Sequence, residues 1–300
     1  MNKLNLNKPG YQWAVLIIVS MLWGTSFILM KKGLQSYSHI QVGAFRMFFA
    51  FILLLPLIIT KLKQLKKKDL YPILNVAFIG NLFPALLFAT AQTRVSSSLA
   101  GMLNSLFPIT ALVIGAMFYS AKVGKRSIAG VIIGLVGSAG LVLGNSQKLI
   151  SGDMFYAGFI LVAMVFYAIS LNEIKYKLPH LSGFTVTAFT FLFAGPVSGV
   201  ILLFTDLQGA FNTADAGINL FYIFVLALFG SVLALLLFYT LVEYVAPVFA
   251  ASITYIIPIF AIMWGVFDGE SVSEIQIFSM VIIFLGVYLV NKRKAKSKKG

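Results

Sequence analysis

Long runs of apolar residues alternate with short polar segments along the whole chain. Because a helix needs about 20 apolar residues to cross the hydrocarbon core of a bilayer, each run predicts a transmembrane helix. The runs lack the period-two alternation that marks membrane β-barrels. Ten runs qualify, at residues 11–31, 40–60, 71–92, 96–119, 127–144, 154–174, 183–205, 218–242, 246–267 and 275–291. The pattern predicts an all-α polytopic membrane protein with ten transmembrane helices.

Each half of the chain carries the same pattern in its middle. Segment 80–115 matches segment 230–265 at a constant shift of 150 residues without a gap, with identities that include Gly80/Gly230, Pro108/Pro258 and Gly115/Gly265. We infer an internal duplication, with halves at 11–144 and 154–291 and a basic tail at 292–300. Each half holds five spans, an odd number, so the second half enters the membrane from the opposite face. The duplication is therefore expected to be an inverted repeat.

The composition agrees with a surface that faces lipid, since 60% of the residues are hydrophobic and 11% are charged. A net charge of +14 could indicate a nucleic-acid partner, but the cations lie in short loops and in the tail. With the N-terminus inside, the inside segments hold eighteen Lys and Arg against four outside, so we expect both termini in the cytoplasm and no nucleic-acid partner. The basic runs 61–68 and 292–299 are then expected to attract anionic lipid headgroups.

Residue types that bind metals are scarce in this chain. There is no cysteine, and the only two histidines, His39 and His180, fall in predicted loops. We expect neither a disulfide nor a metal site nor a resident cofactor.

Arg46 is the only ionisable residue well inside a predicted span. Placing an arginine at a helix centre costs about 2.5–3.5 kcal/mol, so its presence calls for a reason. One hypothesis is that Arg46 binds a carboxylate or phosphate of a solute. The alternative is that its side chain extends to the headgroups or ties its helix to a neighbouring carbonyl.

Trp23, Gly24, Thr25 and Ser26 place an indole, a glycine and two hydroxyls within one turn of the first span. Gly24 permits close approach of another helix, and the hydroxyls can bond to carbonyls one turn earlier. The segment is either a packing notch or a flexible point of a gate, and these interpretations are compatible.

Further polar residues gather at mid-depth on the repeated spans. Pro108 and Pro258 cannot donate an amide, so the carbonyls of Asn104 and Thr254 lose their helical partners and should face protein or a wet cavity. We expect helix breaks or hinges at Gly24, Pro84, Pro108 and Pro258. The predicted cavity residues are Trp23, Thr25, Ser26, Arg46, Asn81, Asn104, Ser105, Tyr167, Ser231, Tyr239, Thr254 and Tyr255.

Several short motifs carry a family resemblance. They are the run Trp23 to Phe27, Arg46 followed by Ala50, the run Ser98 to Ala100 before Pro108, the run Val248 to Ala250 before Pro258, and Gly269-Glu270. In this order and spacing, the sequence resembles the drug/metabolite transporter superfamily, and within it the ten-helix exporters with two EamA-type domains. It departs from that pattern where Ser120 stands in place of an acidic residue and where Val165-Phe166-Tyr167-Ala168 replaces a tryptophan-glycine motif.

The resemblance implies a transporter in a bacterial inner membrane that exports or exchanges small organic metabolites. It implies a central cavity lined mainly by the third, fourth, eighth and ninth spans, with the first and sixth spans closing it. Amino acids and other aromatic or anionic metabolites fit a basic residue beside aromatic rings. None of the acidic residues lies at mid-membrane, so we expect uniport, exchange, or coupling through peripheral groups.

Other functions and assemblies remain to be weighed. A channel-like facilitator would share the architecture, whereas a membrane-embedded enzyme would need paired acids or a histidine beside a carboxylate, and neither pattern is present in or beside a span. Gly130, Gly134 and Gly137 give the fifth span a smooth face, which would allow a homodimer through the fifth and tenth spans.

Overall fold

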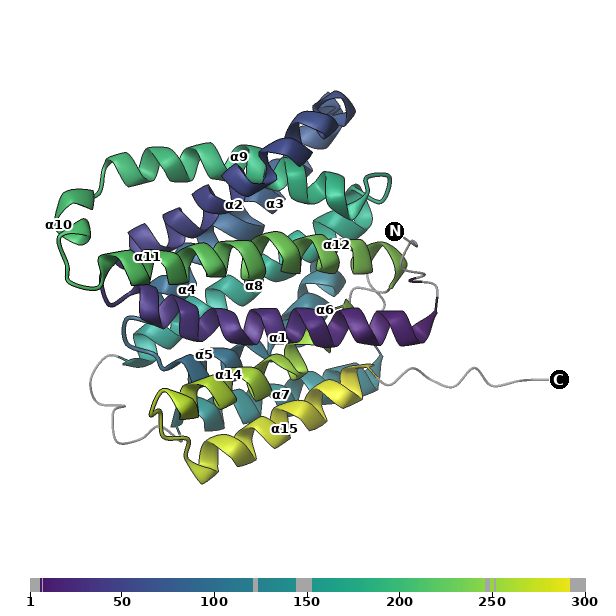
Figure 1. Ribbon diagram of the computed structural model, residues 1–300. Coiled ribbons are helices and arrows are strands. Elements are labelled where there is room, and N and C mark those ends of the chain that lie inside the picture. Colours follow the sequence, from purple (N-terminus) through teal and green to yellow (C-terminus); the bar gives the residue numbers. More distant parts are fainter. Residues whose placement is uncertain are drawn as a thin grey trace.

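The computed structural model describes residues 6, 8–120, 124–143, 153–245, 249–250 and 252–291. This described part contains helices and turns and no strand. Its long helices lie side by side in a bundle, and α1 begins at the side of the bundle where α15 ends (Figure 1). We call that side the N-terminal face and the other the opposite face. The predicted tail 292–300 and Val248 lie outside the described residues.

The first half contributes helices that correspond to the first five predicted spans. They are α1 (Pro9–Gly33), α2 (His39–Lys61), α3 (Leu70–Ala77) with the π-helical segment η3 (Phe78–Leu82) and α4 (Phe83–Ala91), then α5 (Ser97–Asn104) with α6 (Phe107–Phe118), and α7 (Lys125–Leu143). The single turns η1 (Leu62–Gln64) and η2 (Lys67–Asp69) connect α2 to α3.

The second half repeats this order. It comprises α8 (Asp153–Lys177), α9 (Gly183–Leu203), the short α10 (Leu207–Phe211), α11 (Ala216–Val225) with the π-helical segment η4 (Leu226–Leu233) and α12 (Ala234–Tyr244), then the turn η5 (Ser252–Tyr255), α14 (Ile257–Phe267) and α15 (Glu274–Asn291).

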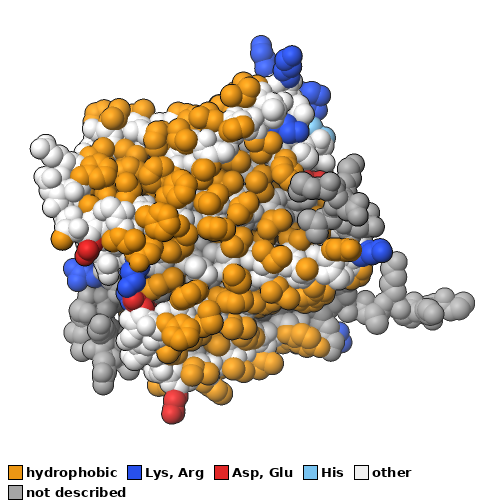
Figure 2. All heavy atoms as spheres, in the orientation of Figure 1, with side chains coloured by type: hydrophobic (Ala, Val, Ile, Leu, Met, Phe, Trp, Pro, Cys, Tyr) orange, Lys and Arg blue, Asp and Glu red, His pale blue; other side chains and the backbone are white. Residues whose placement is uncertain are grey.

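Among the described residues, seven helical stretches are long and apolar enough to cross a membrane. They are Pro9–Gly33, His39–Gln64, Lys67–Ala91, Ser97–Phe118, Met154–Lys177, Gly183–Leu203 and Ala216–Tyr244, with three shorter apolar helices at Ile128–Gly137, Ile253–Phe267 and Glu274–Gly286. Hydrophobic side chains cover most of the face seen in Figure 2, and charged side chains gather towards the two ends of the helices. Such a surface fits a lipid environment and confirms the predicted class of helical membrane protein.

The second span of each half begins with the same cap. Ser38 accepts a hydrogen bond from the backbone of Gln41, and Ser182 accepts one from Thr185. From these caps onward α2 and α9 match at a constant offset of 144 residues, with identities at Ala44/Ala188, Phe45/Phe189, Phe49/Phe193 and Ala50/Ala194. This offset pairs Arg46 with Thr190, so the equivalent position in the second half carries no charge.

The helices next to the cavity are interrupted at equivalent places in the two halves. The π-helical segments η3 and η4 cover Gly80 and Gly230, and Pro84 stands in the first turn after η3. The fourth span breaks between Asn104 and Phe107, and Pro108 then lies in the first turn of α6. Pro258 occupies the same place in α14, after η5. The prolines therefore follow the breaks instead of forming them, which agrees with their tolerance in a first turn.

Gly24 lies within a continuous helix and is not a break. A methyl group there would come within 2.5 Å of the Phe260 Cβ and within 2.9 Å of the Ile257 carbonyl oxygen. Helix α1 therefore packs closely on α14 at this residue. Of the two interpretations given above, this close contact agrees with the packing notch.

The glycines of α7 serve packing within the chain. A methyl group on Gly286 of α15 would come within 2.6 Å of the Gly130 carbonyl oxygen and of the Gly134 nitrogen. A methyl group on Gly137 would come within 2.9 Å of the Ile283 nitrogen. The smooth face of the fifth span is thus in contact with the tenth span of the same molecule.

Equivalent hydrogen bonds join the repeats at the two faces. At the N-terminal face His180 Nε2 lies 3.0 Å from Asp69 Oδ1, and at the opposite face Asn219 Nδ2 donates to Ser36 Oγ at 2.7 Å. Residues 69 and 219 differ by the 150 shift, and residues 36 and 180 by the 144 shift. We call these contacts the N-terminal joint and the opposite joint.

An ionic cluster joins three segments at the opposite face. Lys31, at the end of α1, lies 2.7 Å from Asp268 and 2.8 Å from Glu270, both of which follow α14. Glu270 also accepts hydrogen bonds at 2.9 Å from the backbone amides of Ser97 and Ser98, which open α5. A carboxylate at a helix N-terminus satisfies amides that have no partner within the helix. This cluster, which we call the opposite-face latch, connects α1, α5 and the segment between α14 and α15.

The latch lowers the pKa of both its carboxyl groups. Hydrogen bonds from Lys31 and Lys32 hold the pKa of Asp268 below its ordinary value. For Glu270, burial alone would raise the pKa, but the hydrogen bonds from Lys31, Ser98 and Ser97 outweigh it and leave the pKa below the ordinary value. Both groups are therefore stabilised in their charged form.

Candidate substrate cavity

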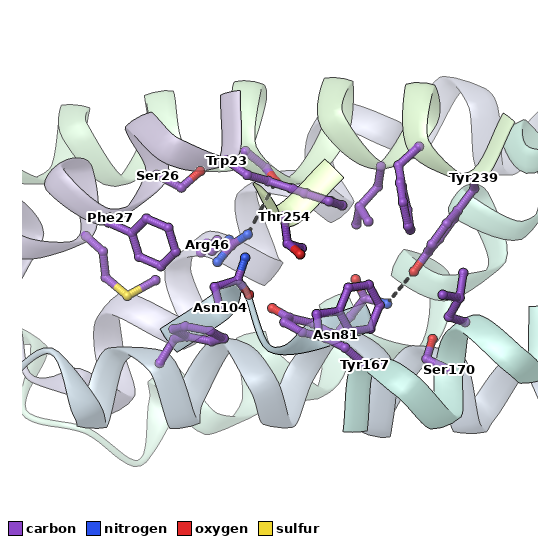
Figure 3. A pocket seen from close by; sticks show the side chains of 18 of the residues that line it. Trp23, Ser26, Phe27, Arg46, Asn81, Asn104, Tyr167, Ser170, Tyr239 and Thr254 are labelled. Carbon is purple, nitrogen blue, oxygen red and sulfur yellow. Dashed lines mark hydrogen bonds between the residues drawn. The ribbon is translucent and has the colours of Figure 1, made fainter. Parts of the chain in front are cut away.

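A central cavity lies between the two halves (Figure 3). About 90 Å³ of it is open to the centres of water-sized molecules. One buried water needs roughly 10–15 Å³ by this measure, so the cavity has room for several waters or one small organic molecule. It is lined by Trp23, Ser26, Phe27, Met30, Arg46, Met47, Gly80, Asn81, Phe88, Asn104, Phe107, Tyr167, Ser170, Leu171, Gly230, Leu235, Phe238, Tyr239 and Thr254.

The two halves supply equivalent residues to this lining. Gly80 packs against the Ser170 side chain, and Gly230 packs against the Ser26 side chain, so the same close contact between the halves occurs twice. The equivalent lining pairs are Gly80/Gly230, Phe88/Phe238 and Asn104/Thr254 at the 150 shift, and Trp23/Tyr167 and Ser26/Ser170 at the 144 shift. Several residues that line the cavity are therefore related by the internal repeat.

Arg46 is buried in the cavity wall, with 9% of its surface exposed. Its Nε donates to Ser231 Oγ at 2.7 Å, and one terminal nitrogen donates to the Gly230 carbonyl at 3.3 Å. Within the described residues it forms no ion pair. The guanidinium does not extend to the membrane surface. It connects α2 to the Gly230 carbonyl, which agrees with the hypothesis that Arg46 ties its helix to a neighbouring carbonyl. These two hydrogen bonds use two of the five N–H donors of the guanidinium.

Two further hydrogen bonds position the lining. Trp23 Nε1 donates to the same Gly230 carbonyl at 3.0 Å, which fixes the indole of α1 on the π-helical segment η4. Asn81 Nδ2 donates to the Val76 carbonyl at 2.8 Å and to the Tyr239 hydroxyl at 3.0 Å, which links η3 to α12 (Figure 3). The π-helical segments thus present backbone and amide groups to the cavity, as such segments often do at functional sites.

Most of the cavity residues predicted from the sequence do line it, and four do not. Thr25 lies on another side of α1, where it accepts a hydrogen bond from Trp264 at 3.0 Å. Ser105 is buried in the break between α5 and α6 and donates to the Met102 carbonyl at 2.6 Å. Tyr255 packs against Phe284 of α15. Ser231 is buried and accepts a hydrogen bond from Arg46. These four residues are not part of the cavity lining, because the rotation of each helix was not readable from the sequence.

The sequence analysis missed Ser170 and most of the apolar lining. The 144 offset would have found Ser170 as the partner of Ser26, and the 150 shift already paired Phe88 with Phe238. No pattern singled out Met30, Met47 or Leu171, which differ from lipid-facing residues only by their position in space. Within the described residues no group of three or more His, Asp or Glu side chains could hold a metal ion.

Comparison with known proteins agrees with this architecture. The model of the EamA-like transporter family matches residues 9–143 and 154–292. The chain is 28% identical over 291 residues to the uncharacterized inner membrane transporter YedA of Escherichia coli K12, covering 92% of each chain. It is 23% identical to the S-adenosylmethionine/S-adenosylhomocysteine transporter of Chlamydia trachomatis, covering 94% of this chain and 90% of that protein. A solved crystal structure superposes with a TM-score of 0.66 at 13% identity, covering 95% of this chain and 97% of that one, which shows the shared fold.

The chain belongs to the EamA-like transporter family. It is an integral inner-membrane transporter and not an enzyme, as the family and the named relatives show.

Proposed function

We propose that this protein exports or exchanges small organic metabolites by alternating access through the central cavity. The observation that carries the proposal is the symmetry of the cavity, which takes equivalent residues from both halves. Two halves of similar sequence can exchange their conformations, and such an exchange moves the opening of a shared cavity from one side of the membrane to the other. Amino acids and related compounds are the first candidate solutes.

The proposal includes a topology. Ten helices cross the membrane as two inverted repeats, at residues 11–144 and 154–291, with both termini in the cytoplasm. The three shorter apolar helices complete the ten together with the seven long ones. The asymmetry of Lys and Arg between the segments supports this orientation.

The proposal also covers coupling. None of the acidic residues lies among the described residues that line the cavity, and carboxylates in pumps commonly sit at mid-membrane. Uniport or exchange, without a proton bound in the cavity, is therefore the coupling that we propose.

The proposed function can be tested by counterflow in proteoliposomes. Vesicles are loaded with a mixed pool of amino acids and other metabolites, and each compound is offered outside in labelled form. We expect saturable exchange of a few related compounds, and none in protein-free vesicles. Flux that rises without saturation would favour a channel-like facilitator, and absence of all flux would contradict the proposal.

A homodimer through α7 and α15 stays a separate prediction. The glycines that suggested it are in contact within the chain, so a dimer would have to use the outer residues of these helices. Ile132 and Leu135 of α7 and Phe278 and Leu285 of α15 are exposed and could form that surface. The mass of the protein in a native membrane extract would decide the matter.

A further inference from the structure

We propose that the solute carries a net negative charge and binds as the counter-ion of Arg46. This inference rests on the proposed function and names the chemical class of its substrate. It narrows the candidate solutes from amino acids and related compounds in general to those that are anions at neutral pH. The central observation is a buried guanidinium that faces a cavity without any acidic side chain among the described residues that line it.

The charge of the cavity is not balanced by the protein. Within the described residues, the hydrogen bonds of Arg46 go to the hydroxyl of Ser231 and to the carbonyl of Gly230, both of them neutral. A buried charge is costly unless it is paired, because a medium of low polarity stabilises an isolated charge much less than water does. An anion in the cavity would remove this cost by neutralising the positive charge. A zwitterion would leave the net charge of the cavity unchanged, and a cation would add a second positive charge.

The fold does not require an arginine at this place. Thr190 is the equivalent residue of α9, and that helix forms without a charge at this position. The side chain of Thr190 is fully buried, and its hydroxyl has no hydrogen-bond partner within the described residues. A position that accepts a small, poorly satisfied side chain in one half does not demand a guanidinium in the other. The positive charge of Arg46 is therefore explained by the cavity and not by the packing of the repeat.

The geometry suits a carboxylate. A guanidinium has five N–H donors, and Arg46 uses two of them on the protein. The remaining donors can bind both oxygens of a carboxylate, the arrangement in which arginine gains most over lysine. Asn104 and Thr254 lie close to Arg46 in Figure 3, and the rings of Trp23 and Phe238 complete an apolar wall. An organic anion with a ring or a hydrocarbon body matches these surfaces.

Four probes with one carbon skeleton separate the effects of charge. They are 3-phenylpropanoate, its amide, phenylalanine and 3-phenylpropylamine, which at neutral pH are an anion, a neutral molecule, a zwitterion and a cation. Binding is measured by the thermal shift and by titration of the purified full chain in detergent. We expect the anion to bind about ten- to hundredfold more tightly than the amide, as a hydrogen bond between charged groups would give. Equal binding of anion and amide, or tighter binding of the zwitterion or cation, would overturn the inference.

Variants of Arg46 assign the preference to this side chain. In Arg46→Gln the advantage of the anion over the amide should disappear, while Arg46→Lys should keep part of it because the charge remains. Thr25→Val is the matched control, since Thr25 contacts Trp264 outside the cavity, and the preference of this variant should equal that of the parent. A preference that persists in Arg46→Gln would contradict the assignment. If Arg46→Gln does not fold, the four probes on the parent protein still decide the charge preference.

Transport of the same probes distinguishes the two proposals. Counterflow of neutral or cationic compounds without a preference for anions would overturn the charge inference and leave the transporter function intact. Preferential binding of the anion in detergent without any flux in vesicles would support the anion site and contradict the proposed transport.

Discussion

Gly24 marks the closest approach of α1 to α14. Its missing side chain allows the Ile257 carbonyl and Phe260 to come into direct contact with the backbone of α1. Two residues of the cavity wall, Trp23 and Ser26, flank this glycine. The contact therefore fixes how far α1 stands from the second half and, with it, the width of the cavity.

Replacement of Gly24 by alanine should destabilise the protein, although alanine is the better helix former. The added methyl group would meet backbone and the Phe260 Cβ, which cannot move away cheaply, so we expect a loss of about 1–3 kcal/mol. Gly10→Ala is the control, since no atom lies within 4 Å of its added methyl group, and it should be neutral or slightly stabilising. Thermal midpoints in detergent provide the measurement. Equal midpoints for the two variants would contradict the packing interpretation.

Individual cavity residues could be predicted only in part, for a physical reason. Asn81, Asn104 and Thr254 were recognisable because polar groups at mid-depth must avoid lipid. Thr25 and Ser26 could not be separated, because α1 is apolar all round and its sequence does not reveal which side faces protein. In a membrane the lipid and the protein interior are similarly apolar, so helix rotation becomes visible only in the packed structure.

At the scale of elements, the opposite-face latch depends on one carboxylate. Glu270 binds Lys31 of α1 and two amides at the start of α5, and its side chain is only 7% exposed. The equivalent position in the first half is Ser120, so the N-terminal face has no such carboxylate at this place. The latch is therefore a property of one face.

Loss of the charge of Glu270 should loosen this face. We expect Glu270→Gln to lower the thermal midpoint at pH 7, by an amount that corresponds to about 1–3 kcal/mol for hydrogen bonds to a charged group. Glu274→Gln is the control. It removes an exposed carboxylate from the first turn of α15 and should cost only a few tenths of a kcal/mol, up to about 1 kcal/mol.

The latch also predicts a pH dependence. The pKa of Glu270 is lowered in the folded protein, so its contribution is fully present above the ordinary glutamate pKa of about 4.3 and is lost as the pH falls through the lower folded value. The difference in thermal midpoint between the parent and Glu270→Gln should shrink as the pH is lowered below that range. A difference that stays constant down to strongly acidic pH would show that the charge is not what stabilises the latch.

The element boundaries were predicted better than their interruptions. The long apolar runs located the helices because lipid demands a minimum apolar length. The π-helical segments η3 and η4 carry no sequence signal of their own beyond Gly80 and Gly230, since their geometry depends on the partners that accept and donate around them. The breaks of the fourth and ninth spans were expected at the prolines and lie just before them.

At the scale of the whole molecule, the proposed topology can be tested directly, because the chain contains no cysteine. Single cysteines at Ala214, between α10 and α11, and at Lys63, between α2 and α3, would be exposed at the opposite and N-terminal faces. We expect a membrane-impermeant maleimide to label Ala214→Cys in intact cells and Lys63→Cys only after the membrane is opened. The reverse pattern would invert the proposed orientation.

The duplication could be read from the sequence, but the difference between its halves needed the structure. Identical residues at fixed shifts revealed the repeat, whereas the pairing of Arg46 with Thr190 required the offset that the helix caps of α2 and α9 define. The two halves share the order of their helices but differ in charge at this pair of positions.

The two joints described above are a second difference between the halves, because different chemical groups form them. The opposite joint pairs a hydroxyl with an amide, while the N-terminal joint pairs an imidazole with a carboxylate, at equivalent positions of the repeat. If the halves exchange conformations, the two end states are not mirror images in energy. Because the two joints consist of different chemical groups, the outward-open and inward-open states would be populated unequally when no solute is bound.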